Sequence, residues 1–384
     1  MRNPKDWGQP CPNPDCPHSR LMHRGNLRAL SPSLTQSGKR RIVRWSTWED
    51  GFSETCDTVF FDVRTPDDKV MMALKMRLVT VGLSDMGFVL GVTEETVLEW
   101  LRRAAQKADE SNASLRRDWP RPQGPREARW SFLRRQQAQQ AGPDGESREG
   151  RADGRQWGWI SCAPECRLLL AACVGPRTFA SALALIRMTA AAVLGGPGFC
   201  RDGFRGSLAA LLAVAQTRKT CPRTGKPGRP QHPLQEPHPA VVSGQGIKKK
   251  RQGRLPELGS RVCCGAERLE PLGLSSRPSW LERLHLPLRH ARAPLVRKRW
   301  RFCKDRTPMR RRVVLVQAFD NFARPHMRLR VSWPEQQPHA SGWMQPKWRH
   351  RTPGMAAGLT DHVWTFRELL TAKFEPRHNH SGSG

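Results

Sequence analysis

The stretch from residue 65 to 107 constrains the fold more than any other part of the chain. Apolar residues recur in it near helical spacing, in three segments separated by a short break and by a turn at Gly91 and Val92. We expect three helices here, the first capped by Thr65 and the third capped by Thr93. This rhythm is typical of a helix-turn-helix, whose second helix enters the major groove of DNA, and equally of a generic three-helix bundle.

The charge of the chain favours DNA as the partner. Lys and Arg number 65 against 34 Asp and Glu, a formal net charge of +31 over 384 residues. Such an excess of positive charge favours binding to a polyanion, because each phosphate that the protein neutralises releases counterions. The expected DNA-contacting residues of the helix-turn-helix are Thr93, Thr96, Arg102 and Arg103. Glu94 and Glu95 argue against phosphate contact at the very start of that helix.

Membrane insertion is not expected. No apolar stretch reaches the roughly 18–20 residues that a bilayer-spanning helix needs, and the charged N-terminus has no apolar segment behind it. The eleven Cys are scattered and odd in number, which favours reduced thiols over a disulfide framework. We therefore expect a cytoplasmic protein.

The front of the chain resembles an incomplete metal site. Cys11 and Cys16 flank a turn with two prolines and are candidate zinc ligands, but a tetrahedral site needs four. A second pair of thiols is expected after the basic strand 39–44, and Trp45 and Trp48 stand there instead. The chain has no Tyr and 14 Trp, a composition that suggests drift or alteration. Zinc is thus a doubtful cofactor here.

The rest of the chain alternates between strand and helix patterns. A further strand is expected at 58–63, and a linker at 109–125. Residues 218–255 are rich in Pro, Gly and Lys, so we expect an exposed, flexible basic insertion. Residues 331–384 give no fold assignment. The remaining expected elements are a strand pair at 157–161 and 167–171, a helix at 178–194, a strand ending near Asp202, and helices at 207–217, 278–300 and 308–322.

Two acidic residues of the second half are candidates for metal chemistry. Asp202 follows a short apolar strand, although an Asp-Gly pair is by itself typical of a simple turn. Glu282 lies on an Arg-rich helical segment, where a solvated partner of Arg283 or Arg289 is the plainer interpretation. Only their combination with the next motifs favours a catalytic role.

Two motifs carry a resemblance to a known family. Residues Asn321 to Leu329 read Asn-Phe-x-Arg-Pro-His-x-x-Leu, similar to the close of the catalytic domain in many integrases and transposases. Residues Leu281 to Lys304 resemble the glutamate-bearing helix of insertion-sequence-one family transposases. The front resembles the zinc ribbon and helix-turn-helix of that family, so the resemblance covers about residues 10–380.

The resemblance implies an α/β fold in several parts. A ribonuclease-H-like mixed sheet flanked by helices would occupy residues 126–330, including the basic insertion. It would follow a zinc-ribbon-like segment at 8–63, the helix-turn-helix at 64–108 and the linker, and precede the C-terminal tail.

The resemblance also implies an Asp/Asp/Glu triad that holds two Mg²⁺ ions for in-line attack on a phosphodiester. Asp202 matches the second Asp and Glu282 matches the Glu, while Glu127 occupies the position of the first Asp. The implied function is that of a transposase in the bacterial nucleoid. It would act as a homo-oligomer on DNA, bind terminal inverted repeats and target DNA, and catalyse cleavage and strand transfer. Further expected DNA contacts are Lys248, Lys249, Lys250, Arg289, Arg324 and His326.

Several residues depart from the family pattern. Glu127 is one methylene longer than Asp, and metal clusters tolerate little displacement. Pro122 and Pro125 interrupt the expected first strand, and Pro287 falls within the expected helix of Glu282. We therefore expect impaired activity. The alternatives are a non-catalytic DNA-binding protein and a product of a decayed element that does not fold.

Overall fold

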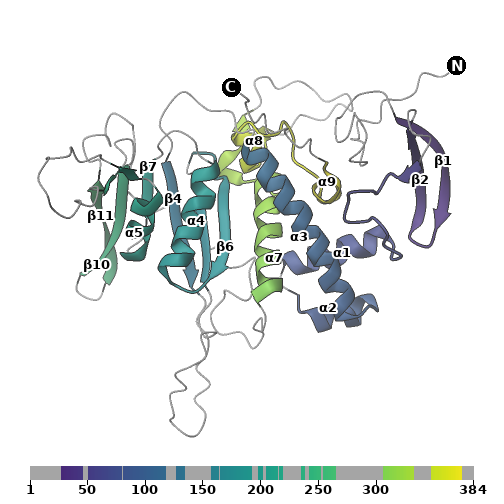
Figure 1. Cartoon of the computed structure of the whole chain (residues 1–384), viewed down its shortest axis with the longest axis horizontal. Coiled ribbons are helices and arrows are strands. Elements are labelled where there is room, and N and C mark those ends of the chain that lie inside the picture. The colour runs from purple at the N-terminus through teal and green to yellow at the C-terminus, as the bar shows by residue number, and fades with distance from the viewer. Residues whose placement is uncertain are drawn as a thin grey trace, which may run out of the picture. The chain divides into compact units, whose positions relative to one another are not determined.

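The structure, a computed structural model, is of mixed α/β class and forms two units. One comprises residues 1–119 together with 307–384, and the other residues 120–306. We describe each unit by itself (Figure 1). The described residues are 27–45, 51–79, 81–117, 127–134, 157–163, 165–192, 198–201, 205–214, 216–218, 235–237, 242–251, 254–264, 306–332 and 347–373.

The first unit contains the three helices expected from the apolar pattern. They are α1 (Asp67–Leu78), α2 (Leu83–Leu90) and α3 (Glu94–Arg117). Thr93 caps α3 as predicted, because its hydroxyl accepts a hydrogen bond from the Thr96 amide at 3.3 Å. The expected cap at Thr65 is wrong, because Pro66 occupies the N-cap position of α1. No side-chain hydrogen bond caps this helix.

The expected linker at 109–125 is also wrong in its first part, because α3 continues to Arg117. Burial explains the longer helix. Ala108, Ser111 and Asn112 are buried, and the Ser111 hydroxyl donates to the Lys107 carbonyl at 2.9 Å. The Asn112 amide donates to the Val314 carbonyl at 3.4 Å, so tertiary packing holds helix where local sequence alone predicts a break.

An antiparallel sheet precedes the helices, in the order β1 (Leu27–Thr35), β2 (Gly38–Trp45) and β3 (Gly51–Ser53). The strand expected at 58–63 is wrong, because this segment forms turns. Asp57 and Asp62 adopt positive φ angles of 60° and 51°, which aspartate tolerates and a strand excludes. The neighbours Val59 and Phe60 are both buried, whereas a strand would point them to opposite faces.

The C-terminal elements belong to this same unit. The expected helix at 308–322 is present as α7 (Arg306–Ala318) and the π-helical turn η3 (Phe319–Ala323). The described parts of the tail beyond residue 330, to which the sequence pattern assigns no structure, contain short elements. These follow the 3-10 turn η4 (Met327–Leu329) as β12 (Val331–Ser332), β13 (Trp348–Arg349), α8 (Pro353–Ala356) and α9 (Phe366–Thr371).

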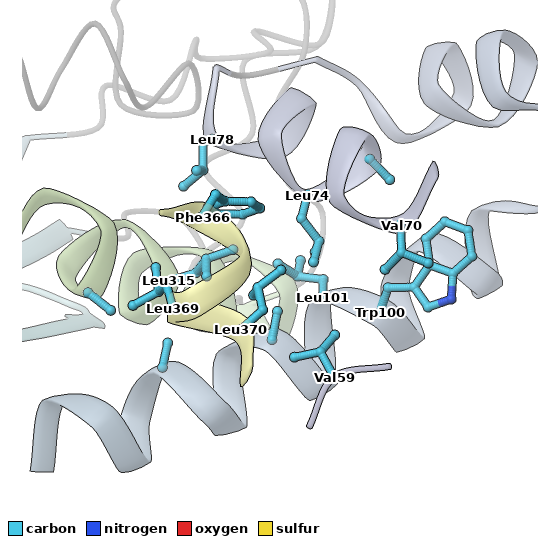
Figure 2. Close-up of a cluster of buried hydrophobic side chains, with 14 of the residues drawn as sticks. Val59, Val70, Leu74, Leu78, Trp100, Leu101, Leu315, Phe366, Leu369 and Leu370 are labelled. Atoms are coloured by element: carbon cyan, nitrogen blue, oxygen red, sulfur yellow. The ribbon is translucent and has the colours of Figure 1, made fainter. Parts of the chain in front are cut away.

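One hydrophobic core in this unit contains side chains of helices α1 and α3 and of the C-terminal helix α9. Phe366, Leu369 and Leu370 of α9 point toward Leu74 of α1 and Leu101 of α3 (Figure 2). All five side chains are buried, and burying one of this size stabilises a fold by roughly 1.5–3 kcal/mol. The C-terminal helix is therefore part of the core of the three-helix segment.

The second unit is built on a six-stranded sheet in the order β11-β10-β7-β4-β5-β6. β4 pairs in parallel with β7, and β7 with β10, while the other neighbours are antiparallel. The strands are β4 (Glu127–Arg134), β5 (Trp157–Cys162), β6 (Leu169–Gly175), β7 (Gly198–Arg201), β10 (Val242–Arg251) and β11 (Arg254–Cys264). The expected strand pair, β5 and β6, is confirmed.

Helices and a small ladder complete this unit. α4 (Phe179–Ala192) and α5 (Arg205–Val214) lie at two of the expected helical segments. The buried Leu185 and Ile186 belong to α4, and the Thr189 hydroxyl of α4 donates to the Ser161 hydroxyl of β5 at 2.7 Å. β8 (Gln216–Arg218) and β9 (Gln235–Pro237) form a separate two-stranded ladder.

The expectation of a structureless insertion at 218–255 is wrong in part. Val242 to Gln245 of β10 pair with Gly198 to Arg201 of β7 in the six-stranded sheet. A backbone ladder forms without regard to side-chain polarity, so the Lys-rich composition misleads here. Among the described residues, no helix is long and apolar enough to cross a membrane.

Candidate nucleic-acid interface

The turn between α2 and α3 is short and contains a glycine in the left-handed conformation. Gly91 adopts the left-handed conformation with φ 59°, which glycine reaches without steric penalty. The Val92 amide then donates to the Gly87 carbonyl at 3.1 Å and closes the end of α2. The expected turn at Gly91 and Val92 is confirmed.

Gly87 allows the two helices to approach, and the sequence interpretation missed it. A Cβ at this position would lie 2.8 Å from the Val92 carbonyl oxygen, closer than real Cβ contacts. Met86 and Leu90 of α2 and Val97 and Trp100 of α3 are buried around this approach. A small residue four positions before the turn glycine is the signal that would have indicated it.

The first turn of α3 presents two hydroxyls. Thr93 is exposed and Thr96 half-buried, and their Oγ1 atoms lie 3.0 Å apart in a hydrogen bond. Both were expected to contact DNA. Side chains at the start of the second helix are the ones that reach base edges in this type of motif. The structure brings this pair together at the N-terminal end of α3.

Arg102 and Arg103, the expected phosphate contacts of α3, are both held by Glu99. Arg102 Nε donates to Glu99 Oε2 at 2.7 Å and Arg103 Nε to Glu99 Oε1 at 2.9 Å. Arg103 also donates to the Phe61 carbonyl. The hydrogen bonds from Arg102 and Arg103 lower the pKa of Glu99 to about 2. A DNA phosphate must compete with this carboxylate for the two guanidinium groups.

Asp67 connects three distant parts of the first unit. On one side it forms an ion pair with Arg40 of β2, and on the other with Arg367 of α9, whose Nη1 lies 2.8 Å from Asp67 Oδ2. Burial alone would raise the pKa of Asp67, but its hydrogen bonds to the two arginines outweigh this effect and lower the pKa. The cluster fixes α1 between the N-terminal sheet and the C-terminal helix.

The segment that carried the family resemblance, Asn321 to Leu329, is anchored to the C-terminal elements. The Phe322 ring lies 5.2 Å from that of Trp364, and a Cβ on Gly354 would come within 2.7 Å of Phe322 Cδ1. The His326 amide donates to the Arg351 carbonyl at 2.9 Å. This motif therefore has a structural role in the first unit.

The two expected DNA contacts of this segment have intramolecular partners as well. Arg324 forms an ion pair with Asp320 at 2.8 Å and lies over the Phe319 ring at 5.3 Å. His326 caps η4, because its Nδ1 accepts a hydrogen bond from the Arg328 amide at 3.4 Å. Both side chains are half-exposed. They remain at the surface next to a set of further basic residues.

The expected catalytic residue Glu127 begins strand β4. The sheet register pairs Glu127 with Gly198 and Arg129 with Cys200 of β7. Asp202, the expected partner of Glu127, lies outside the described residues, so their pairing stays a prediction.

Several predicted residues lie outside the described part of the chain or are described only by their backbone. Lys248 and Lys249 lie on β10 opposite Leu258 and Glu257 of β11, and Lys250 follows them on the same strand. Within the described ranges, no three His, Cys, Asp or Glu residues gather closely enough to hold a metal ion. The predicted residues outside the described ranges are Cys11, Cys16, Asp202, Glu282 and Arg289.

Comparisons of the chain with protein-family models, with curated proteins and with solved structures find no match. Inference of function therefore relies on the chain's own residues and on their arrangement.

Proposed function

We propose that this chain is a DNA-binding protein of the insertion-sequence transposase type, with impaired strand-transfer chemistry. The observation that carries the proposal is the turn between α2 and α3. Gly91 has the left-handed φ that such a turn needs, and Gly87 has no side chain where the Val92 carbonyl approaches. Both hydroxyls of the expected base-reading turn, Thr93 and Thr96, lie directly after it.

A ribonuclease-H-like fold for the unit of residues 120–306 is part of the proposal, a narrower range than the 126–330 that the resemblance implied. Three antiparallel strands, β4 to β6, follow one another, and β7 and β10 then join the other side of β4 in parallel. This order supports the proposal of a ribonuclease-H-like sheet, with β11 added at the edge. Helices α4 and α5 connect strands as such a fold requires.

The impaired chemistry is inferred from the first acidic position. A two-Mg²⁺ mechanism needs carboxylates converging on one phosphodiester. Glu127 is one methylene longer than the Asp of the family pattern, and metal clusters tolerate little displacement. The family resemblance also supports a homo-oligomer on paired inverted repeats in the bacterial nucleoid.

DNA binding is tested with the full chain and a duplex library of random sequence. We expect repeated selection to enrich a preferred sequence, and a Thr93→Ala, Thr96→Ala variant to lose this preference while it still binds duplexes. A Ser33→Ala, Ser37→Ala variant of the β1–β2 hairpin is the matched control. Absence of any duplex binding by the folded chain would refute the proposal.

Catalysis is tested separately on the selected duplex with Mg²⁺. We expect no strand-transfer product from the chain as it stands, nor from a Glu127→Asp variant, because Pro122, Pro125 and Pro287 depart from the family pattern in both proteins. Product formed by either protein would contradict the assignment of impaired chemistry, without affecting the claim of DNA binding.

A further inference from the structure

A basic surface lies beside the segment that ends in η4. The residues 324–332 and 347–351 include six Lys or Arg and two His, and they contain no Asp or Glu. The exposed side chains among them lie on or next in sequence to the short ladder of β12 and β13, in which Val331 pairs with Arg349 and Ser332 with Trp348. We call this surface the basic ribbon, and its members are Arg328, Arg330, Lys347, Trp348, Arg349 and His350.

Trp348 organises the cations of the basic ribbon. The Arg330 guanidinium carbon lies 4.4 Å from the centre of the indole ring, and Lys347 Nζ lies 5.8 Å from it. A stacked guanidinium keeps its edge N–H groups free to bind an anion, and stacking restricts its rotamers before any ligand arrives. The half-buried indole thus presents two positive charges outward.

The backbone of the basic ribbon is tied to the rest of the unit. Arg351 Nε donates to the Leu329 carbonyl at 2.8 Å, and Arg349 Nη2 donates to the Asp361 carbonyl at 2.9 Å. Asp361 is the neighbouring acid, and its carboxylate is hydrogen-bonded to His362 Nδ1 at 2.6 Å. The cations therefore lie on a fixed support.

We propose that the basic ribbon binds the phosphate backbone of duplex DNA and supplies more phosphate contacts than helix α3. The inference rests on the proposed function and extends it to residues that the sequence interpretation did not assign. Guanidinium groups match phosphate oxygens through paired N–H donors. A lipid surface is the weaker fit, because it rewards an exposed apolar face and the indole is covered by cations.

The test measures affinity for a fluorescein-labelled random duplex of about 30 base pairs, over a range of salt concentrations. The variant Arg328→Gln, Arg330→Gln, Lys347→Gln removes three charges from the basic ribbon. The control Arg64→Gln, Arg187→Gln, Arg310→Gln removes three charges from other exposed positions. We expect the basic-ribbon variant to bind at least about tenfold more weakly than the control. Its salt slope should fall by about 2–3, near 0.9 for each phosphate that is no longer neutralised.

A single Arg328→Gln variant guards against misfolding, because this exposed side chain lies outside the Trp348 stack. We expect a smaller decrease in affinity and a slope reduced by about 1. Equal effects of the basic-ribbon and control variants, in a wild-type chain that does bind duplex, would overturn this inference alone. The inference would also be overturned if the basic-ribbon variant lost binding to anionic phospholipid vesicles while its binding to duplex stayed unchanged. A wild-type chain that binds no duplex would refute the proposed function as well.

Discussion

Helix α3 and the basic ribbon belong to the same unit but differ in charge. The part of α3 from residue 94 to 110 has five acidic residues against three basic ones, whereas all the charged residues of the segments around the basic ribbon are basic. Helix α3 begins at a tight turn, and its arginines are held by Glu99. Phosphate contacts position a protein on DNA, and base contacts give it specificity. Under the proposed function, these two tasks would fall on different elements of this unit.

The largest expected effect comes from the core that both regions share. Leu101→Ala should lower the free energy of unfolding by about 2–5 kcal/mol, because the side chain is fully buried between α1 and α9. Urea unfolding measures it, and Leu34→Ala at an exposed position of β1 is the control. Both sequence preference and duplex affinity should fall together. A fall in one property alone would mean that α3 and the basic ribbon do not share a fold.

Asp67 tests the connection between α1, β2 and α9. Asp67→Asn should destabilise the chain by about 1.5–3 kcal/mol at neutral pH, because two arginines lose their charged partner. The exposed Asp68→Asn on the same turn should change stability little. Because the folded-state pKa of Asp67 lies below 3.8, its contribution is present above about pH 4 and is lost as pH falls through that folded-state pKa. A difference between variant and wild type that persists at lower pH would contradict the ion-pair assignment.

A substitution at Gly87 tests whether α3 and the basic ribbon bind DNA independently of each other. Gly87→Ala places a Cβ 2.8 Å from the Val92 carbonyl oxygen, so the turn must shift, at a cost of about 1–3 kcal/mol. We expect weaker sequence preference in the duplex selection and unchanged non-specific affinity through the basic ribbon. Val89→Ala, exposed on the same helix, is the control. Equal loss of both kinds of binding would argue against separate tasks.

Glu99 is expected to give the smallest effect, and one of opposite sign. Glu99→Gln frees Arg102 and Arg103, so affinity for the random duplex should rise about threefold to tenfold and the salt slope should steepen by about 1. Glu95→Gln removes the same charge from an exposed position on the first turn of α3. Equal gains in the two variants would show that the freed arginines do not reach phosphate.

Much of the helical fold could be predicted from the sequence. The apolar spacing indicated α1, α2 and α3, and Gly91 and Thr93 indicated the turn and the cap between them, because these signals are local. The failures are non-local. Residues 109–117 look like a linker until Val314 supplies a partner for Asn112. The strand β10 looks like a basic insertion until β7 supplies its ladder.

The candidate site was predicted only in part, for the same reason. Thr93 and Thr96 could be predicted from their place in the motif. The hydrogen bonds from Arg102 and Arg103 to the Glu99 carboxylate could not, because they depend on side-chain rotamers. The basic ribbon brings together segments separated by the residues 333–346, and two-residue strands are too short to give a periodic pattern. A local signal did exist for α9, since Thr365 and Glu368 have the spacing of a capping box.

The ion pair between Asp67 and Arg367 has a consequence for how the protein is made. The two residues stand 300 positions apart, so the length-dependent entropy of closing this loop is about 5 kcal/mol. At about 5–20 residues per second, a ribosome needs roughly 15–60 s between them. Throughout that time α1 and α3 lack the leucines of α9 that cover them. The core of this unit is thus complete only after α9 has been made, and a chain that stops before α9 lacks part of its core.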